Sequence, residues 1–227
     1  MSSQPGAYKI KFSHRRSIGI LVTPDEGVIV RAPYRTPQHI IDKFVTSKSD
    51  WINKHLVNYS GMIRLNLTGI DDGSPVMYRG VGYRIKLCAS EKNSVCLLEN
   101  EIVIYSKKSG DMAAVQIILE NWYKRMAAEQ IVPMVEDILK RLSRYGFKPS
   151  GISIRAMRRR WGSCSSKGRI TINSELIKLE SRYLEYVILH ELCHLRHHNH
   201  SHEYYNLLSE VCPDWKEIRK SLRNYIT

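Results

Sequence analysis

The first 60 residues place apolar side chains in a pattern that is typical of strands followed by a helix. Ile18, Ile20 and Val22 occupy alternate positions, and another apolar segment follows a turn at residues 24–27. Residues 38–59 then repeat apolar side chains at helical spacing. We therefore expect a strand hairpin and one helix in this part of the chain.

The middle of the chain predicts further strands and then a long helix. Four short apolar segments separated by Gly or Asn turns indicate a strand meander, at residues 76–78, 83–87, 95–98 and 102–105. Asp111 is a suitable N-cap for a helical region that reaches about residue 145. Pro133 lies inside this region and should kink or split it, because proline lacks the backbone donor and clashes with the preceding turn.

The last third of the chain predicts short strands and then helices. Two strands and three helices are expected, at residues 152–154, 169–172, 181–197, 201–211 and 214–225. Ser181 is a reasonable N-cap for the first of these helices. The whole pattern predicts an α+β fold. A β-rich N-terminal region with one helix occupies residues 1–110, and a helical domain with a small antiparallel sheet occupies residues 111–227.

Composition and charge narrow the class of protein. The 227 residues are 43% hydrophobic and 25% charged, as in an ordinary globular protein. The net charge of +13 favours anionic partners such as nucleic acid or nucleotides, or serves as a solubilising surface. Five cysteines without a CxxC pair indicate a reduced, cytoplasmic protein, and neither a signal peptide nor a membrane span is expected. Composition indicates no particular oligomeric state.

One motif carries candidate chemistry, the HExxH string that begins at His190. His190 and His194 are one helical turn apart, so both imidazoles can approach one zinc ion, with another divalent metal as the alternative. Glu191 follows at about a quarter turn, where a general base could take a proton from a metal-activated water. The stretch is amphipathic, with an apolar stripe formed by Leu184, Val187, Ile188, Leu192 and Leu195.

A catalytic zinc site needs a third protein ligand and one open position. We choose His200, because it lies beyond an expected helix break at Asn199 and the chain can turn back there; His202 is the alternative. A structural zinc site with four protein ligands would require Cys193 or His202 as well. On a helix Cys193 points about 100° away from His194, so we interpret it as a small core residue.

These motifs resemble the YgjP-like family of predicted zinc metallopeptidases, relatives of the SprT-like minimal zincins. The resemblance covers nearly the whole chain and is strongest at residues 160–165 (RWGSCS), 170–173 (ITIN), 186–195 (YVILHELCHL) and 199–201 (NHS). It implies a zincin-like domain with zinc held by His190, His194 and His200 and with Glu191 as the base.

The resemblance also implies a substrate-binding edge. The strand around Trp161, Gly162 and Ser163 should border the cleft, where an extended peptide could pair with it. The chain departs from the family pattern at Glu180, where a proline is usual, and at residues 204–205, where two tyrosines replace a Phe-Trp-like pair. Both departures are interpreted as capping or packing.

Three functions remain open at this point. The first is a zinc metallopeptidase that acts on a peptide or protein. The second is a metal-dependent nucleoside triphosphate pyrophosphatase or phosphohydrolase, in which an arginine of the cluster Arg155, Arg158, Arg159 and Arg160 would clamp phosphates. The third is a nucleic-acid-binding module with structural zinc. The HExxH motif favours the peptidase.

Overall fold

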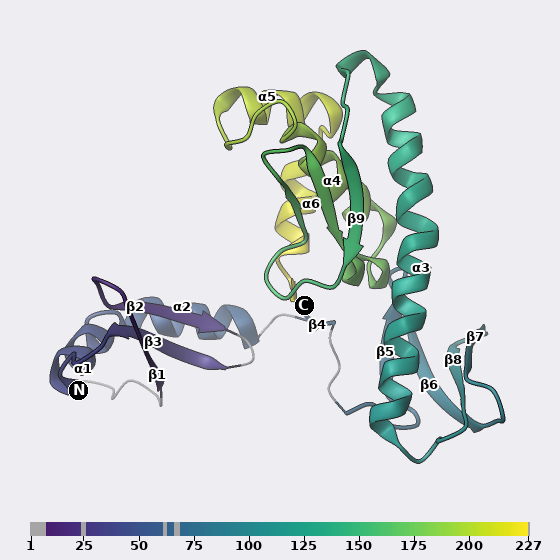
Figure 1. The fold of residues 1–227 in the computed structure, drawn as a ribbon, viewed down its shortest axis with the longest axis horizontal. Helices are drawn as coiled ribbons and strands as arrows, with labels where there is room; N and C mark the ends of the chain where they lie inside the picture. Colours follow the sequence, from purple (N-terminus) through teal and green to yellow (C-terminus); the bar gives the residue numbers. More distant parts are fainter. Residues whose placement is uncertain (1–7, 24–25, 61–62, 66–68, 227) are drawn as a thin grey trace. The chain divides into compact units, whose positions relative to one another are not determined.

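The computed structural model describes residues 8–23, 26–60, 63–65 and 69–226. The chain divides into two compact units, Met1–Ile63 and Arg64–Thr227. Figure 1 shows the order of helices and strands along each unit. The mixture of helices with several small sheets confirms the α+β class.

The first unit combines a small sheet with helices. Its described strands and helices are β1 (Tyr8–Ser13), β2 (Gly19–Thr23), β3 (Gly27–Pro33), α1 (Gln38–Thr46) and α2 (Ser49–Ser60). β3 lies in the centre, parallel to β1 and antiparallel to β2, so the predicted hairpin is present. The single predicted helix is interrupted at Ser47, which caps α1. Pro24 and Asp25 of the predicted turn lie outside the described residues.

The second unit begins with a four-stranded sheet. After β4 (Ile63–Arg64), at the division between the units, come β5 (Pro75–Tyr78), β6 (Val81–Ala89), β7 (Ser94–Leu98) and β8 (Glu101–Ser106). The spatial order is β5-β6-β8-β7, with β6 parallel to β8. The predicted strands are therefore present, but the predicted meander is wrong, because β8 is placed between β6 and β7.

A 30-residue helix, α3 (Met112–Arg141), follows this sheet. The Asp111 side chain accepts a hydrogen bond from the backbone N–H of Ala114, as the predicted N-cap requires. Pro133 does not split α3, which continues through it as one helix. A short 3-10 helix, η1 (Ser143–Tyr145), ends at Gly146, whose positive φ of 63° suits glycine.

The second sheet of this unit is built from β9 (Gly151–Arg155), β10 (Gly162–Cys164) and β11 (Arg169–Asn173). β11 is central, parallel to β9 and antiparallel to β10. The sheet is thus mixed and not wholly antiparallel as predicted. β10 occupies one edge of the sheet.

Helices complete the second unit. They are η2 (Ser174–Lys178), α4 (Ser181–Cys193), α5 (His202–Val211) and α6 (Trp215–Leu222), followed by β12 (Tyr225–Ile226). Ser181 is the first residue of α4 and not its N-cap; Glu180 takes that position and makes no side-chain capping bond. α4 also ends at Cys193, four residues before the predicted limit.

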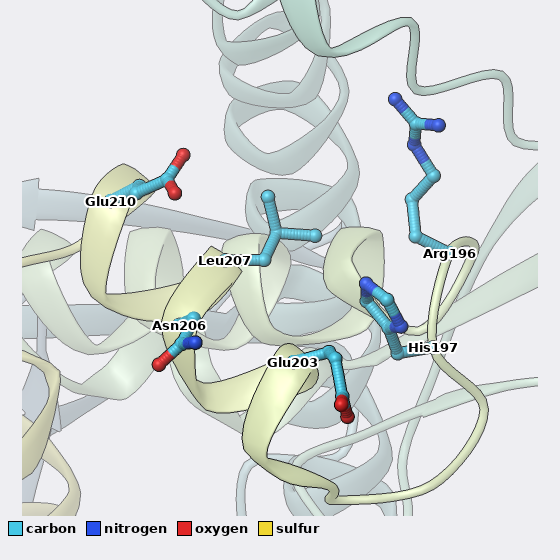
Figure 2. Close-up of a pocket in the computed structure, with 6 residues that line it drawn as sticks. All are labelled: Arg196, His197, Glu203, Asn206, Leu207 and Glu210. Atoms are coloured by element: carbon cyan, nitrogen blue, oxygen red, sulfur yellow. The ribbon is translucent and has the colours of Figure 1, made fainter.

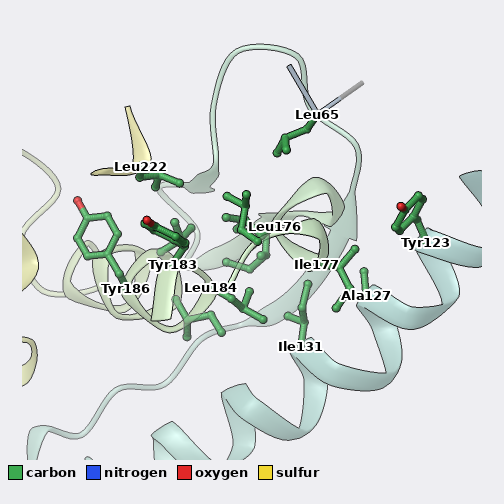
Figure 3. Close-up of a cluster of buried hydrophobic side chains, with 14 of the residues drawn as sticks. Leu65, Tyr123, Ala127, Ile131, Leu176, Ile177, Tyr183, Leu184, Tyr186 and Leu222 are labelled. Atoms are coloured by element: carbon green, nitrogen blue, oxygen red, sulfur yellow. The ribbon is translucent and has the colours of Figure 1, made fainter. Parts of the chain in front are cut away.

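One hydrophobic core joins the parts of the second unit. Figure 3 shows Ala127 and Ile131 of α3 directed toward Ile177 of η2 and Leu184 of α4. Strands β5, β6 and β8 bury side chains in the same core. The boundary between the two compact units falls between residues 63 and 64. The predicted boundary between an N-terminal region and a catalytic domain, at residues 110 and 111, stays a prediction.

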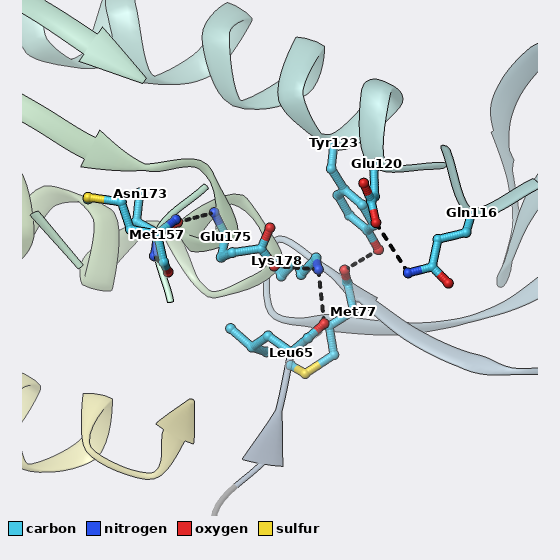
Figure 4. Close-up of polar contacts among 9 residues, drawn as sticks. All are labelled: Leu65, Met77, Gln116, Glu120, Tyr123, Met157, Asn173, Glu175 and Lys178. Atoms are coloured by element: carbon cyan, nitrogen blue, oxygen red, sulfur yellow. Dashed lines mark hydrogen bonds and ion pairs between the residues drawn. The ribbon is translucent and has the colours of Figure 1, made fainter. Parts of the chain in front are cut away.

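A buried ion pair anchors η2 just before α4. Lys178 lies 2.5 Å from the carboxylate of Glu175, and its ammonium also donates to the carbonyl oxygen of Leu65 at 2.9 Å (Figure 4). The same ammonium sits 4.6 Å from the centre of the Tyr123 ring on α3. Because this buried charge has several partners, η2 is held firmly between α3 and the start of α4.

Candidate metal centre

Helix α4 positions two of the predicted site residues at its C-terminal end. The helix packs against β10, β11, α5 and α6, and it buries Val187, Ile188 and Leu192 in the core. His190 lies in its last turn, and His194 is the residue that caps it in α-helical conformation. The two imidazoles consequently lie one above the other, with ring centres 5.0 Å apart.

His200 joins them from the segment before α5. Its ring centre lies 5.2 Å from that of His190 and 4.7 Å from that of His194. One nitrogen from each of the three rings can be chosen so that all lie within 4.8 Å of one another. Within the described part of the chain this is the one such group of three metal-ligating side chains, and it includes neither Cys193 nor His202.

The hydrogen bonds of the rings indicate which nitrogens are free to bind an ion. Nδ1 of His194 lies 3.0 Å from the carbonyl oxygen of His197, to which it can donate when it carries the ring proton. That tautomer leaves the lone pair on Nε2. The Nε2 atoms of His190 and His200 face each other at 3.3 Å. Three nitrogens thus converge from two elements of the fold.

The environment of two of the candidate ligands favours their neutral form. Burial, reinforced by the neighbouring His194 and His200, lowers the pKa of His190 to about 3. Burial likewise lowers the pKa of His200. Neutral imidazole is the form that binds metal, and a site with three histidine ligands leaves the open fourth position of a catalytic zinc site. The donor set therefore fits a zinc ion.

Tyr204 is part of this centre, although the sequence suggested only a packing role. Its fully buried ring lies 4.6 Å from the ring of His194 and 4.8 Å from that of His200, measured between centres. Its hydroxyl donates to the carbonyl oxygen of His190 at 3.2 Å. Ser201, the N-cap of α5, accepts from the backbone N–H of Tyr204 and so fixes the position of this first helical turn.

Glu191 is a buried carboxylate beside the three histidines. Only 4% of the residue is exposed, and its Oε2 atom has no hydrogen-bond partner. Burial raises its pKa to about 7, while the positive charge of Arg160 opposes this shift. A carboxyl group poised near neutral pH can both accept and return a proton.

The edge strand β10 approaches Glu191 closely. A Cβ atom built on Gly162 would lie 2.5 Å from Oε1 of Glu191 and 2.7 Å from its Cγ. Both distances are shorter than real Cβ contacts, so any larger residue would displace the carboxylate. Glycine at this position is required by the approach of Glu191 to the strand.

A cavity of about 280 Å³ opens beside this pair. Arg160, Trp161 and Gly162 line it, as predicted for the substrate edge, together with His190 and Glu191. The predicted neighbour Ser163 is not among the lining residues. Of the predicted arginine cluster, Arg160 alone reaches this cavity.

Asn173, which the sequence did not mark as functional, fastens the loop that carries Arg160. Its buried side-chain amide donates to the carbonyl oxygens of Met157 at 2.8 Å and Arg160 at 3.0 Å. Its carbonyl accepts from the N–H groups of Met157 and Glu175 (Figure 4). One side chain thereby connects the arginine loop to η2 and positions the edge of the cavity.

A second pocket, of about 420 Å³, lies on another face of α5. Figure 2 shows its lining residues, Arg196, His197, Glu203, Asn206, Leu207 and Glu210. His197 lines this pocket and is not one of the three clustered histidines. None of the three clustered histidines lines it.

Comparison with known proteins places the chain in a class of enzymes. A model of a metallopeptidase domain matches residues 16–225. The domain is that of the YgjP-like family, and because the match spans nearly the whole sequence, the chain belongs to this family. Membership supports a metal-dependent hydrolase of the peptidase class.

Two solved structures are similar to part of the chain. They are the metallopeptidase zymogens jannalysin of Methanocaldococcus jannaschii, at 26% identity, and abylysin of Pyrococcus abyssi, at 24%. Each aligns with 41% of this chain, at a TM-score of 0.36, and the alignments cover 93% and 91% of the respective relatives. No curated protein matches the sequence. Among the described helices, none is both long and apolar enough to cross a membrane.

Proposed function

We propose that this protein is a zinc-dependent peptidase in which His190, His194 and His200 hold the ion and Glu191 is the general base. The observation that carries the proposal is the convergence of three imidazoles beside a buried carboxylate that has an unpartnered oxygen. A purely structural site would have no use for such a carboxylate. The family supports the same class of chemistry.

The ion and the protein would divide the chemistry between them. When bound, zinc would polarise the scissile carbonyl and make water acidic enough to be deprotonated near neutral pH. Glu191 would accept that proton and then return it to the nitrogen of the leaving amine. The absence of a side chain at Gly162 leaves room for the Glu191 carboxylate beside the edge strand.

The edge of β10 would align the peptide. β11 occupies one side of β10, and the order of the sheet leaves β10 at its margin. An extended substrate could add there as a further strand and use the backbone groups of β10 as partners. Trp161 and Gly162, which line the cavity, would then flank the scissile bond.

The test compares wild type with Glu191→Gln on two classes of substrate. Zinc-loaded protein is incubated with an unstructured protein, and separately with nucleoside triphosphates in the presence of magnesium or manganese. We expect cleavage of the unstructured protein alone, abolished by chelation and reduced at least about 1,000-fold in Glu191→Gln. Glu136→Gln, which removes an exposed carboxylate from α3, is the matched control.

Two results would reject the proposal. Hydrolysis of triphosphates without proteolysis would assign the site to phosphohydrolase chemistry. Proteolysis that persists in Glu191→Gln would remove the glutamate from the mechanism, even if the protein is a peptidase.

A further inference from the structure

The cavity beside the candidate metal centre is bordered by three arginines. Arg160 precedes β10, Arg219 lies on α6, and Arg223 caps the end of α6. Arg219 and Arg223 are four residues apart, so they lie one above the other on the same side of the helix. The sequence patterns pointed to Arg160 but not to the two arginines of α6.

No carboxylate neutralises this group. Among the described residues, none of the three arginines forms an ion pair within 4.0 Å, whereas Arg141 and Arg182 each pair with a glutamate. Glu191 is the one acidic residue that lines the cavity, against three arginines. The cavity therefore carries a net positive charge at neutral pH.

Helix α6 holds Arg219 in a defined place. Trp215, Ile218 and Leu222 are buried, and the indole N–H of Trp215 donates to the Ser209 hydroxyl at 2.9 Å. The Trp215 ring stacks on Tyr205, with ring centres 5.0 Å apart. The tyrosine ring in turn stacks on that of His200, at 6.0 Å. Helix α6 is thus packed against the metal centre, and the guanidinium of Arg219 lies 6.0 Å from the centre of the Trp215 ring.

The remaining walls of the cavity are largely apolar. Trp161, Val187 and Leu222 line it beside the arginines, together with the ring of Tyr186. A volume of about 280 Å³ suits one amino-acid side chain and not a large cofactor. An apolar wall with cationic groups at its margin matches a short aliphatic chain that ends in a carboxylate.

Resting on the proposed peptidase function, we propose that this cavity binds a carboxylate of the peptide substrate next to the scissile bond. The carboxylate belongs either to an Asp or Glu side chain or to a free C-terminus. Arginine recognises both through paired, charge-assisted N–H donors. The protein would then prefer acidic cleavage sites, and Arg219 and Arg223 would be its specificity-determining residues.

The first experiment maps the sites that the wild-type protein cleaves in an unstructured protein, using mass spectrometry. We expect Asp, Glu or the C-terminus to be enriched at one position beside the cut. Matched peptides then carry Glu, Gln or Lys at that position, and a further pair ends there in a free carboxylate or an amide. The Glu peptide should exceed the Gln peptide in kcat/KM by about tenfold, as one charge-assisted contact predicts. Comparison of the peptides that end in a carboxylate or an amide shows whether the cavity binds an internal side chain or a C-terminal carboxylate.

The second experiment removes the two charges of α6. Arg219→Gln with Arg223→Gln should lower kcat/KM for the Glu peptide about tenfold while changing that for the Gln peptide less than about twofold. Lys216→Gln with Lys220→Gln, an equal loss of two charges at exposed positions of the same helix, should keep the preference. Zinc content and melting temperature confirm that each variant retains its fold and its ion.

The outcomes separate this proposal from the one on which it rests. If wild type cleaves the Glu and Gln peptides equally, and also cleaves the carboxylate and amide peptides equally, the carboxylate site is overturned and the peptidase function is left intact. An equal loss on both peptides in the double variant overturns the specificity role of Arg219 and Arg223. Turnover of triphosphates with no peptide cleavage overturns both proposals.

Discussion

The side chain of Glu191 occupies the space that a Cβ atom on Gly162 would fill. The hypothetical atom would lie 2.5 Å from Oε1, 2.7 Å from Cγ and 2.9 Å from Cδ of the glutamate. Two segments nearly 30 residues apart in sequence therefore meet without a side chain between them. This contact places the candidate base directly against the edge strand that would align a substrate.

Gly162→Ala should impair activity more than folding. The methyl group would push the Glu191 carboxylate from its position, and kcat should fall by at least about 100-fold because proton transfer depends on geometry. The loss of stability should be about 1–3 kcal/mol, as is usual for overpacking. Steady-state kinetics and thermal unfolding measure the two effects.

Gly82→Ala is the matched control for that substitution. A Cβ atom at Gly82 meets nothing within 4 Å, and this residue lies in β6, apart from the candidate centre. Both activity and melting temperature should stay close to wild type. Normal kcat in Gly162→Ala would show that Glu191 can act from another position, contrary to the close fit seen here.

His200→Ala and His202→Ala should differ in zinc content. His200 belongs to the group of three histidines, whereas the ring of His202 interacts with the side-chain amide of Asn206. Loss of one of three ligands should weaken zinc binding by more than about 100-fold, which exceeds the usual effect of mutating a residue that only hydrogen-bonds to a ligand. Metal analysis after dialysis, with competition by a chromophoric chelator, measures this. The reverse pattern would make His202 the third ligand.

The sequence was sufficient to place two of the clustered histidines and the adjacent Glu191, because helical periodicity relates residues four apart. The apolar stripe of α4 predicts that His190 and His194 share a face, and the structure brings both rings together with His200. Helix ends were less accurate: Glu180 and not Ser181 is the N-cap of α4. Local sequence patterns predict which residues are buried more accurately than they predict the residue at which a helix begins.

Contacts between distant segments were not predictable in the same way. The order β5-β6-β8-β7 depends on which strands pair, and hydrophobic alternation does not encode the partner. In the sequence, Asn173 is an ordinary residue at the end of a strand. Only the structure shows that its amide donates to the carbonyl oxygens of Met157 and Arg160. Arg219 lies 28 residues beyond Glu191 on helix α6, and it lines the cavity. The spacing of apolar residues along α6 predicts the helix but not its position beside the cavity.

Glu191 should make the metal-free protein less stable as pH rises. Its pKa is raised from 4.5 to about 7 in the folded state, so the folded state binds this proton more tightly than the unfolded chain does. The stabilisation from the neutral carboxyl is complete below about pH 4.5 and is lost as pH rises through 7. Arg160, Cys164, Tyr186 and Tyr204 are the other titratable groups coupled to it, and Glu191→Gln leaves all four unchanged.

Urea unfolding of wild type and Glu191→Gln in chelator, between pH 5 and 8, measures this effect. Wild type should lose up to roughly 3 kcal/mol relative to the variant over this interval, at about 1.4 kcal/mol per unit of pKa shift. Zinc should reduce the difference, because a nearby cation favours the carboxylate. Parallel stability curves without metal would mean that the carboxyl is not desolvated.

Asn173→Leu should destabilise the protein and loosen the loop that carries Arg160. Leucine has a similar size but cannot replace the four hydrogen bonds that the amide makes with the backbone of Met157, Arg160 and Glu175. Removing such partners from buried groups costs about 1–3 kcal/mol for each group left unsatisfied, so the total loss should exceed about 3 kcal/mol. Urea unfolding measures the loss, and limited proteolysis should reveal new cleavage at residues 157–160. Asn206→Leu, at an exposed position of α5, is the control and should change neither property. An unchanged proteolytic pattern in Asn173→Leu would mean that β10 and its hairpin hold the loop without help from this amide.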